Sequence, residues 1–216
     1  MTDPQLTLIA VLLDRSGSME TVKSDIEGAF MAFIADQADA PGEARVTLAQ
    51  FDTEFEVVFA NRPIGKVGPL ELQPRGMTAL YDSMGRLITD VGAELRATPE
   101  AERPGKVIIV VMTDGHENSS QEWTHQAVGT AIKRQERDYA WDFVFLGANM
   151  DAVQIGTSLG FAPDKSMTWD ADGEGVANAM ASTSAYVRRS RLAAPGVAAA
   201  GFSPEDRRAA SSRTTQ

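Results

Sequence analysis

Residues 6–18 read LTLIAVLLDRSGS, a nearly unbroken apolar run that stops abruptly at Asp14. Apolar runs without alternating polar residues are typical of strands that are buried on both faces, as in parallel sheets. A second run of this kind, from Lys106 to Met112, ends two residues before Asp114. The two runs predict buried parallel strands, each followed by a polar loop that begins at or near an aspartate.

The segments around these runs alternate between helical and strand patterns. Strand patterns occur at residues 45–51, 55–59, 141–146 and 166–169, and a tight turn joins the first two as a hairpin. Apolar residues at helical spacing predict helices at about residues 22–34, 80–95, 124–138, 151–159 and 175–192. This alternation predicts an α/β fold with a doubly wound open sheet, mostly parallel with one antiparallel edge strand, and helices on both faces.

Length and composition favour one folded domain. The chain has 216 residues, of which 43% are hydrophobic and 23% charged, as is usual for globular proteins. We expect this domain to span residues 1–192. Residues 193–216 are rich in Ala, Ser, Arg, Gly and Pro and contain few core-forming side chains, so we expect a disordered C-terminal tail.

Charge and residue usage exclude several classes of function. The net charge of −10 disfavours sequence-independent binding to nucleic acid or to an anionic membrane. The chain has no cysteine, which excludes disulfides, thiolate zinc sites and cysteine nucleophiles, and only two histidines. Its apolar runs are too short to span a membrane, and no basic segment precedes the first run, so we expect a soluble, cytoplasmic protein.

Oxygen-bearing side chains gather in three predicted loops. Because ligands bind at the carboxyl ends of the strands in open α/β sheets, we expect these loops to meet there. Such an all-oxygen set suits a hard cation, Mg²⁺ or Mn²⁺, and Ca²⁺ also fits. Each residue alone could instead cap a helix, since Asp, Ser and Thr are common caps. The candidate metal ligands are Asp14, Ser16, Ser18, Thr78 and Asp114.

The pattern Asp14-x-Ser16-x-Ser18, then Thr78, then Asp114-Gly resembles the metal-ion-dependent adhesion site (MIDAS) of von Willebrand factor A (vWA) domains. The resemblance extends over about residues 4–190 and is closest to stand-alone bacterial or phage vWA proteins. It implies a Rossmann-like sheet with a metal ion at its top. In this family the serines and the threonine contact the ion, and the aspartates bind it directly or through water.

The resemblance also implies a function. A partner protein commonly completes the metal shell with an acidic side chain, so the chain would be a metal-dependent protein-binding module and not an enzyme. The alternative is a metal-dependent hydrolase of the phosphatase type. The phosphatases nearest in fold need a second aspartate two residues after the first, where this chain has Ser16. A Ser–His–Asp set from Ser18, His116 and Asp114 has only sequence proximity in its favour.

Several residues near the predicted site are ambiguous. His116, Glu117 and Trp123 follow the second buried strand and could select a partner or simply form a solvated loop. Arg15 and Arg75 could attract an acidic partner, or serve only as solubilising surface charges. The sequence alone does not separate these interpretations.

Overall fold

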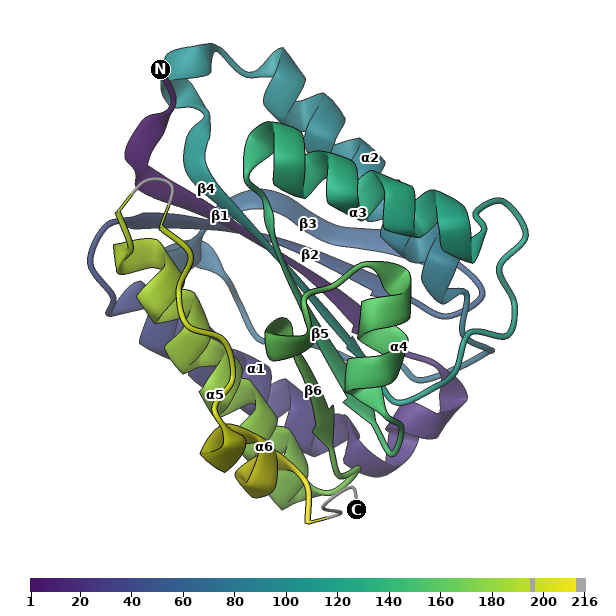
Figure 1. Cartoon of the computed structure of the whole chain (residues 1–216). Coiled ribbons are helices and arrows are strands. Elements are labelled where there is room, and N and C mark those ends of the chain that lie inside the picture. Colours follow the sequence, from purple (N-terminus) through teal and green to yellow (C-terminus); the bar gives the residue numbers. More distant parts are fainter. Residues whose placement is uncertain (195–196, 213–216) are drawn as a thin grey trace.

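One sheet organises the chain. The computed structural model describes residues 1–194 and 197–212, and within them six strands follow the order β3-β2-β1-β4-β5-β6 (Figure 1). β3 is antiparallel to β2, and the other neighbouring strands are parallel. The expected doubly wound sheet with one antiparallel edge strand is therefore confirmed. The strands are β1 (Asp3–Asp14), β2 (Glu43–Phe51), β3 (Phe55–Pro63), β4 (Pro104–Thr113), β5 (Asp142–Ala148) and β6 (Ser166–Trp169).

Helices cover both faces of this sheet, as expected. One face carries α1 (Lys23–Ala38) and α5 (Gly173–Leu192), and α6 (Pro204–Ala210) lies beside α5 (Figure 1). The other face carries α2 (Leu80–Ala97), α3 (His125–Tyr139) and α4 (Ala152–Leu159). No helix in the described part of the chain is long and apolar enough to cross a membrane.

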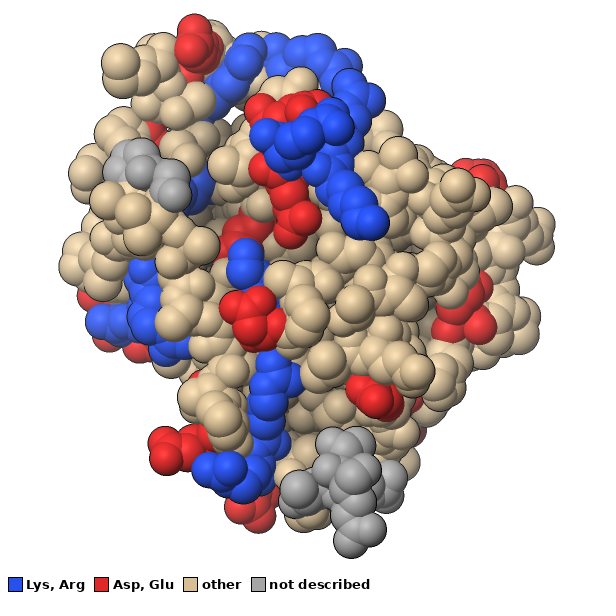
Figure 2. Space-filling view, in the orientation of Figure 1, with Lys and Arg blue, Asp and Glu red and all other residues tan. Residues whose placement is uncertain are grey.

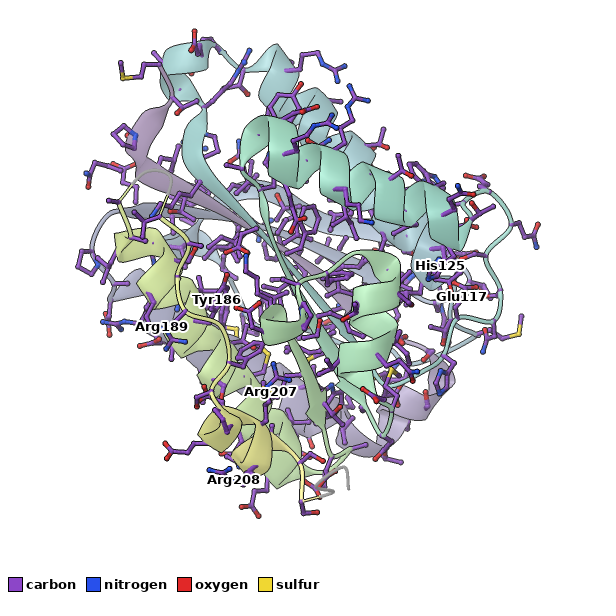
Figure 3. The ribbon with its side chains drawn as sticks, in the orientation of Figure 1. Glu117, His125, Tyr186, Arg189, Arg207 and Arg208 are labelled. Carbon is purple, nitrogen blue, oxygen red and sulfur yellow. The ribbon has the colours of Figure 1, made fainter. Side chains whose placement is uncertain are left out.

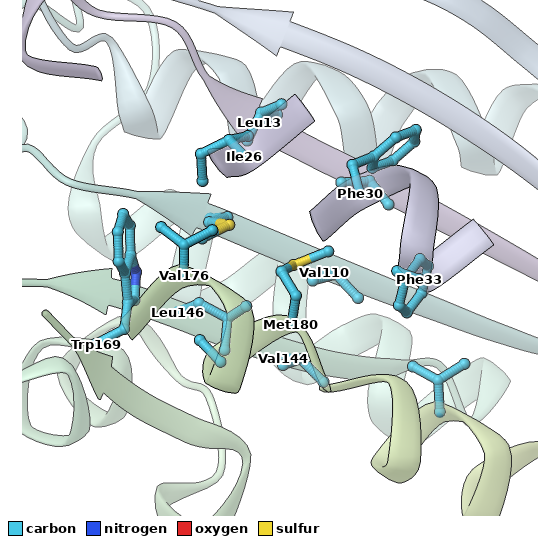
Figure 4. Packing of buried hydrophobic residues seen from close by; sticks show 14 of the residues in the cluster. Leu13, Ile26, Phe30, Phe33, Val110, Val144, Leu146, Trp169, Val176 and Met180 are labelled. Carbon is cyan, nitrogen blue, oxygen red and sulfur yellow. The ribbon is translucent and has the colours of Figure 1, made fainter. Parts of the chain in front are cut away.

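Each face of the sheet has its own apolar core. Successive strand residues point to opposite faces, so β1 contributes to both cores. Ile9, Val11 and Leu13 pack on the side of α1 and α5, and residues 8, 10 and 12 pack on the side of α2 to α4. Figure 4 shows the first core, where Phe30 of α1 and Met180 of α5 approach the sheet. This double burial explains why the first strand is apolar without alternation.

The order of the strands brings two predicted loops together. β1 and β4 are neighbours, and Leu13 is paired with Met112 at their carboxyl ends. Asp14 and Asp114 therefore leave the sheet side by side. After β1 the chain passes through α1 to β2, which lies on the side of β1 opposite β4. In doubly wound sheets, a crevice opens outside the carboxyl ends of two such neighbouring strands.

The C-terminal segment differs from the expectation. Residues 195–196 and 213–216 of the expected tail lie outside the described residues, but residues 197–212 are ordered against the body, so the expectation of disorder is wrong for them. Phe202 is buried, with its ring 5.8 Å from that of Tyr186 on α5. Arg207 of α6 donates to the carbonyl oxygens of Ser166 and Pro163 at 2.6 and 2.8 Å (Figure 3).

A sequence signal for this helix was present. Ser203 caps α6 by accepting from the Asp206 amide, and the Asp206 carboxylate accepts from the Ser203 amide. This reciprocal pair, with Pro204 at the first helical position, is a recognised start of a helix. Composition alone predicted disorder because this segment contains few core-forming side chains.

Replacing Phe202 by alanine tests the docking of this segment. We expect Phe202→Ala to lower the free energy of unfolding by about 3 kcal/mol, because a buried aromatic ring is lost from its contact with α5. Leu192→Ala is the control, since Leu192 is 61% exposed and should change stability by about 0.5 kcal/mol or less. Urea denaturation of both variants measures the difference, and equal stabilities would show that the segment does not dock.

Candidate metal centre

Asp14 is the most deeply placed of the candidate ligands. It ends β1 with no exposed surface. Its Oδ1 accepts from the Ser16 amide at 2.6 Å, and its Oδ2 accepts from the Thr113 hydroxyl at 2.5 Å. Both carboxylate oxygens are thus oriented by the ends of β1 and β4, which fixes the side chain in one position.

The two serines continue from Asp14 toward solvent. Ser16 is buried, whereas Ser18 is exposed at the start of a 3₁₀ turn that spans Gly17–Val22. The Ser16 and Ser18 hydroxyl oxygens lie 3.2 Å apart, and the Ser18 hydroxyl donates to Asp114 Oδ1 at 2.7 Å. Hydrogen bonds therefore connect Asp14, through the Ser16 amide and the two serine hydroxyls, to Asp114.

Thr78 reaches the same place from the loop before α2. It is buried. Residue 115 is a glycine, and if it carried a Cβ atom, that atom would lie only 2.7 Å from the Thr78 Oγ1. Any residue larger than glycine there would push Thr78 away from Asp114. The Asn118 side chain accepts from the Thr78 amide at 2.9 Å, and the Thr78 carbonyl accepts from the Asn118 amide at 3.1 Å. The structure therefore brings all five candidate ligands together.

Both carboxylates lie in a poorly solvated environment. Burial raises the pKa of Asp14 to about 6, against the hydrogen bonds from Thr113 and Ser16, which lower it. Burial likewise raises the pKa of Asp114, against the hydrogen bond from Ser18. Among the described residues, neither aspartate has an ion pair with Lys, Arg or His. Two adjacent carboxylates without a cationic side chain are the environment that a metal cation stabilises.

Only two of the five candidate metal ligands carry a negative charge. The described residues contain no group of three or more His, Cys, Asp or Glu side chains that could hold a metal ion. Here two carboxylates lie with three hydroxyl groups, so a cation bound by these residues would have only oxygen ligands. That chemistry fits Mg²⁺, Mn²⁺ or Ca²⁺, and it does not favour zinc or copper.

A buried ion pair connects the loops that carry the ligands. Asp52, which is 1% exposed, accepts from Arg15 Nε at 2.8 Å and from Arg75 Nε at 2.9 Å. The Arg75 amide also donates to the Arg15 carbonyl, and the Ala79 amide to the Asp52 carbonyl. Asp52 therefore joins the loop of Ser16 to the loop of Thr78. Arg15 is buried, so it is neither a solubilising surface charge nor free to attract a partner.

The residues after Asp114 mainly form hydrogen bonds with the start of α2. Glu117 accepts from the amides of Tyr81, Ser119 and Ser120, and it lies at the N-terminal end of α3 in Figure 3. In return, Asp82 of α2 accepts from the amides of residues 121, 122 and 123. Glu117 therefore has a structural role in holding the loop to α2. His116 is exposed and can still contact a partner.

Three residues support the site through contacts that were not expected from the sequence. Thr113 orients Asp14, Asn118 holds Thr78, and Asp52 connects two loops. Thr113 could have been found, because it directly precedes Asp114 and ends a buried strand. Asp52 could not, because its partners are 37 and 23 residues away in the sequence and only the hairpin of β2 and β3 brings it near them.

Comparisons with known proteins identify the fold. No protein-family model matches the chain, and no curated protein matches it significantly in sequence. Its fold is similar to that of proximal thread matrix protein 1 from the mussel byssus, solved with a zinc-occupied MIDAS motif, at 17% identity and a TM-score of 0.58 over 84% of this chain and 46% of that chain. It is also similar to a von Willebrand factor type A protein from Catenulispora acidiphila, at 16% identity and a TM-score of 0.58 over 85% and 43% of the two chains.

The pilus adhesin SpaC from Lactobacillus rhamnosus GG, in an open conformation, is a third similar structure. Its identity is 16% and its TM-score 0.60, over 85% of this chain and 30% of that chain. The chain spans less than half the length of each of these three proteins. These likenesses show that the chain has the vWA fold, which confirms the expectation from the sequence.

Removing the Asp52 carboxylate tests the connection between the loops. We expect Asp52→Ala to lower the free energy of unfolding by about 3 kcal/mol, because Arg15 would keep its buried charge and lose the buried partner. Glu54→Ala is the matched control: Glu54 is 73% exposed and pairs with the exposed Arg75, so it should cost about 0.5 kcal/mol or less. Thermal and urea denaturation measure both, and an Asp52 variant as stable as the Glu54 variant would contradict the role of this ion pair.

Proposed function

We propose that this chain is a metal-dependent protein-binding module. Asp14, Ser16, Ser18, Thr78 and Asp114 together hold one divalent cation, Mg²⁺ or Mn²⁺, and Ca²⁺ also fits these oxygen ligands. When bound, the cation supplies a positive charge and open coordination positions that can accept a carboxylate oxygen from outside. The partner is a protein that presents an Asp or Glu side chain to this edge of the sheet.

One observation carries the proposal. Asp14 is a fully buried carboxylate that forms no ion pair with a Lys, Arg or His side chain in the described part of the chain, and it is hydrogen-bonded through Ser16 and Ser18 to a second carboxylate, Asp114. A buried charge without a partner is costly, so such an arrangement is retained where an external cation neutralises it. The zinc-occupied MIDAS motif of the mussel protein, which has the same fold, supports a divalent cation here.

The residues have separate roles in this proposal. Thr113 and the Ser16 amide orient Asp14, so that its carboxylate stays in place whether or not a partner is bound. Ser18 is exposed, which leaves the outer side of the site accessible. Met77, which precedes Thr78, is 54% exposed and offers a partner an apolar contact beside the site. Oxygen ligands and an open outer side suit recognition of a carboxylate.

Binding is favoured over hydrolysis by the positions of the side chains. The Ser18 hydroxyl donates to Asp114, and its other contact is the Ser16 hydroxyl. Within the described residues, His116 has no hydrogen bond to Ser18 or to Asp114. A Ser–His–Asp relay would need an imidazole that accepts from the serine hydroxyl. In the part of the chain that the structure describes, no imidazole accepts from the Ser18 hydroxyl, which supports a binding site over a Ser–His–Asp relay.

Metal titration tests the proposed ligands. We expect calorimetry to show one Mg²⁺ or Mn²⁺ site in the wild type and none in Asp14→Asn, because a neutral amide removes half of the site's negative charge. The control Asp90→Asn changes an exposed aspartate on α2 and should bind like the wild type. Equal metal binding by the wild type and Asp14→Asn would refute the assignment.

The same variants separate loss of metal from loss of folding. In EDTA we expect Asp14→Asn to unfold at or above the wild-type temperature, because the buried charge is removed and the amide oxygen can still accept a hydrogen bond. Added Mg²⁺ should then raise the unfolding temperature of the wild type and not that of the variant. Differential scanning calorimetry measures both effects. A variant already unfolded in EDTA would make Asp14 a structural residue.

Capture of a partner tests the role of Thr78. Relative to the wild type, we expect Thr78→Ala to retain about a tenth or less of the partner from a lysate of the source cell, because a coordinating hydroxyl is missing. Thr78→Ser keeps the hydroxyl and should restore capture. Bound proteins are quantified by mass spectrometry with Mg²⁺ and with EDTA, and recovery that is the same in both conditions would contradict metal-dependent recognition.

A further inference from the structure

A long groove lies between α2 and α3, on the face of the sheet away from α1 and α5. Its volume is about 820 Å³, which is within the range of ligand pockets. Small residues make it wide: Gly92 on α2 and Ala127 and Ala131 on α3 leave space between the two helices. Trp141 and Val107 contribute apolar surface to its lining.

Charge is distributed unevenly around this groove. No residue that lines it is acidic, although the chain as a whole has a net charge of −10. Three arginines line it, Arg96, Arg103 and Arg134. Figure 2 shows Lys and Arg side chains gathered at the top of the molecule, over the C-terminal ends of α2 and α3. The groove therefore offers its positive charge at one end.

Two carboxylates near the groove, Asp138 and Glu100, are paired with other groups. Asp138 forms two hydrogen bonds with Arg137, at 2.7 and 3.0 Å, and lies 3.9 Å from Arg134. Glu100 pairs with the N-terminal amino group at 2.8 Å. Arg103 donates to backbone carbonyl oxygens at the end of α2. Within the described residues, the guanidinium group of Arg96 has no partner at all, so it is available to an anion.

The shape of the groove favours an elongated ligand. The lining along α3 extends from its N-cap residue, Thr124, to Arg134, which are about 15 Å apart at the rise of an α-helix. Trp123 lies at the end opposite the arginines, because it directly precedes the start of α3. An occupant that follows this wall meets an aromatic ring at one end and positive charge at the other.

Two threonines on the walls of the groove hydrogen-bond within their own helices. The Thr89 hydroxyl donates to the Gly85 carbonyl at 2.7 Å, and the Thr130 hydroxyl donates to the Gln126 carbonyl at 2.8 Å. A hydrocarbon chain requires no hydrogen bond from these walls, so it can lie against them and against the apolar surface of Trp141 and Val107.

We propose that the groove between α2 and α3 binds an acyl-chain carboxylate, with the chain between the helices and the carboxylate near Arg96. This site is separate from the proposed metal centre and does not depend on it. Its chemistry is that of a medium-length free fatty acid.

Decanoate is a suitable probe below its aggregation concentration. Trp123 and Trp141 line the groove, so we expect decanoate to change the tryptophan fluorescence of the wild-type chain saturably. All titrations contain EDTA, so that the carboxylate cannot bind a metal ion at the other edge of the sheet. Decanol, which has the same chain without the charge, should bind about tenfold more weakly, because it lacks the charge-assisted contact with Arg96.

Two variants test the position of the ligand. Gly92→Leu fills the groove from inside: a Cβ atom at this position meets only Gln135 and Trp141, both at 3.9 Å, so the fold accommodates it. It should abolish binding. Arg96→Ala should weaken decanoate binding by about three- to tenfold and leave decanol binding unchanged. Arg86→Ala, on the same helix but outside the groove, is the matched control and should bind decanoate as the wild type does.

Several outcomes would overturn the proposal. These are an absence of any saturable fluorescence change, undiminished binding to folded Gly92→Leu, or equal affinities for decanoate and decanol. Asp14→Asn gives an independent readout, because it should lose metal binding and retain decanoate binding. Failure of the acyl site and failure of the metal site are therefore distinguishable.

Discussion

The burial of β1 on both faces of the sheet determines the rest of the site. A strand in that position has no solvent-facing side, so its last residue, Asp14, is also withdrawn from water. The chain contains a second buried aspartate nearby, Asp52, and the two carboxylates have different hydrogen-bonding and charged partners. Burial opposes the charge of Asp52, but hydrogen bonds from Arg75 and the Glu54 amide and the charge of Arg15 outweigh it, and its pKa is lowered. Asp14 receives only neutral donors, and its pKa is raised to about 6.

This contrast separates a structural carboxylate, Asp52, from a proposed metal ligand, Asp14. Asp52 is neutralised within the fold and holds two loops in position, so it has no charge left to offer a ligand. Asp14 is oriented as firmly by Thr113 and the Ser16 amide, but its charge is not compensated. The fold thus fixes the position of the Asp14 carboxylate, and within the described residues no Lys, Arg or His side chain pairs with it. Glu117 is likewise a structural carboxylate, because it accepts hydrogen bonds from backbone amides.

The sequence predicted the fold well where burial has a strong pattern. The runs that became β1 and β4 are apolar throughout because helices cover both sides of them, and the two aspartates mark where each run reaches the edge. The proposed metal ligands could be selected because their loops follow directly from those strand ends. Other parts of the structure depend on contacts between residues far apart in the chain, which no local sequence pattern predicts. The buried pair of Arg15 with Asp52 spans 37 residues, and the docking of α6 rests on Arg207 donating to the carbonyl oxygens of residues 163 and 166.

The charges around the site also constrain how a partner could be recognised. Arg15 and Arg75 are the arginines nearest in sequence to the proposed ligands, and both pair with Asp52, while Glu56 and Glu54 pair with their remaining nitrogens. Their positive charge is thus compensated within the protein. The overall charge of −10 repels a carboxylate at long range. In the proposed function, attraction of an acidic side chain to this edge would therefore come from the bound cation, and a neutral or basic surface around that side chain would best tolerate the acidic body.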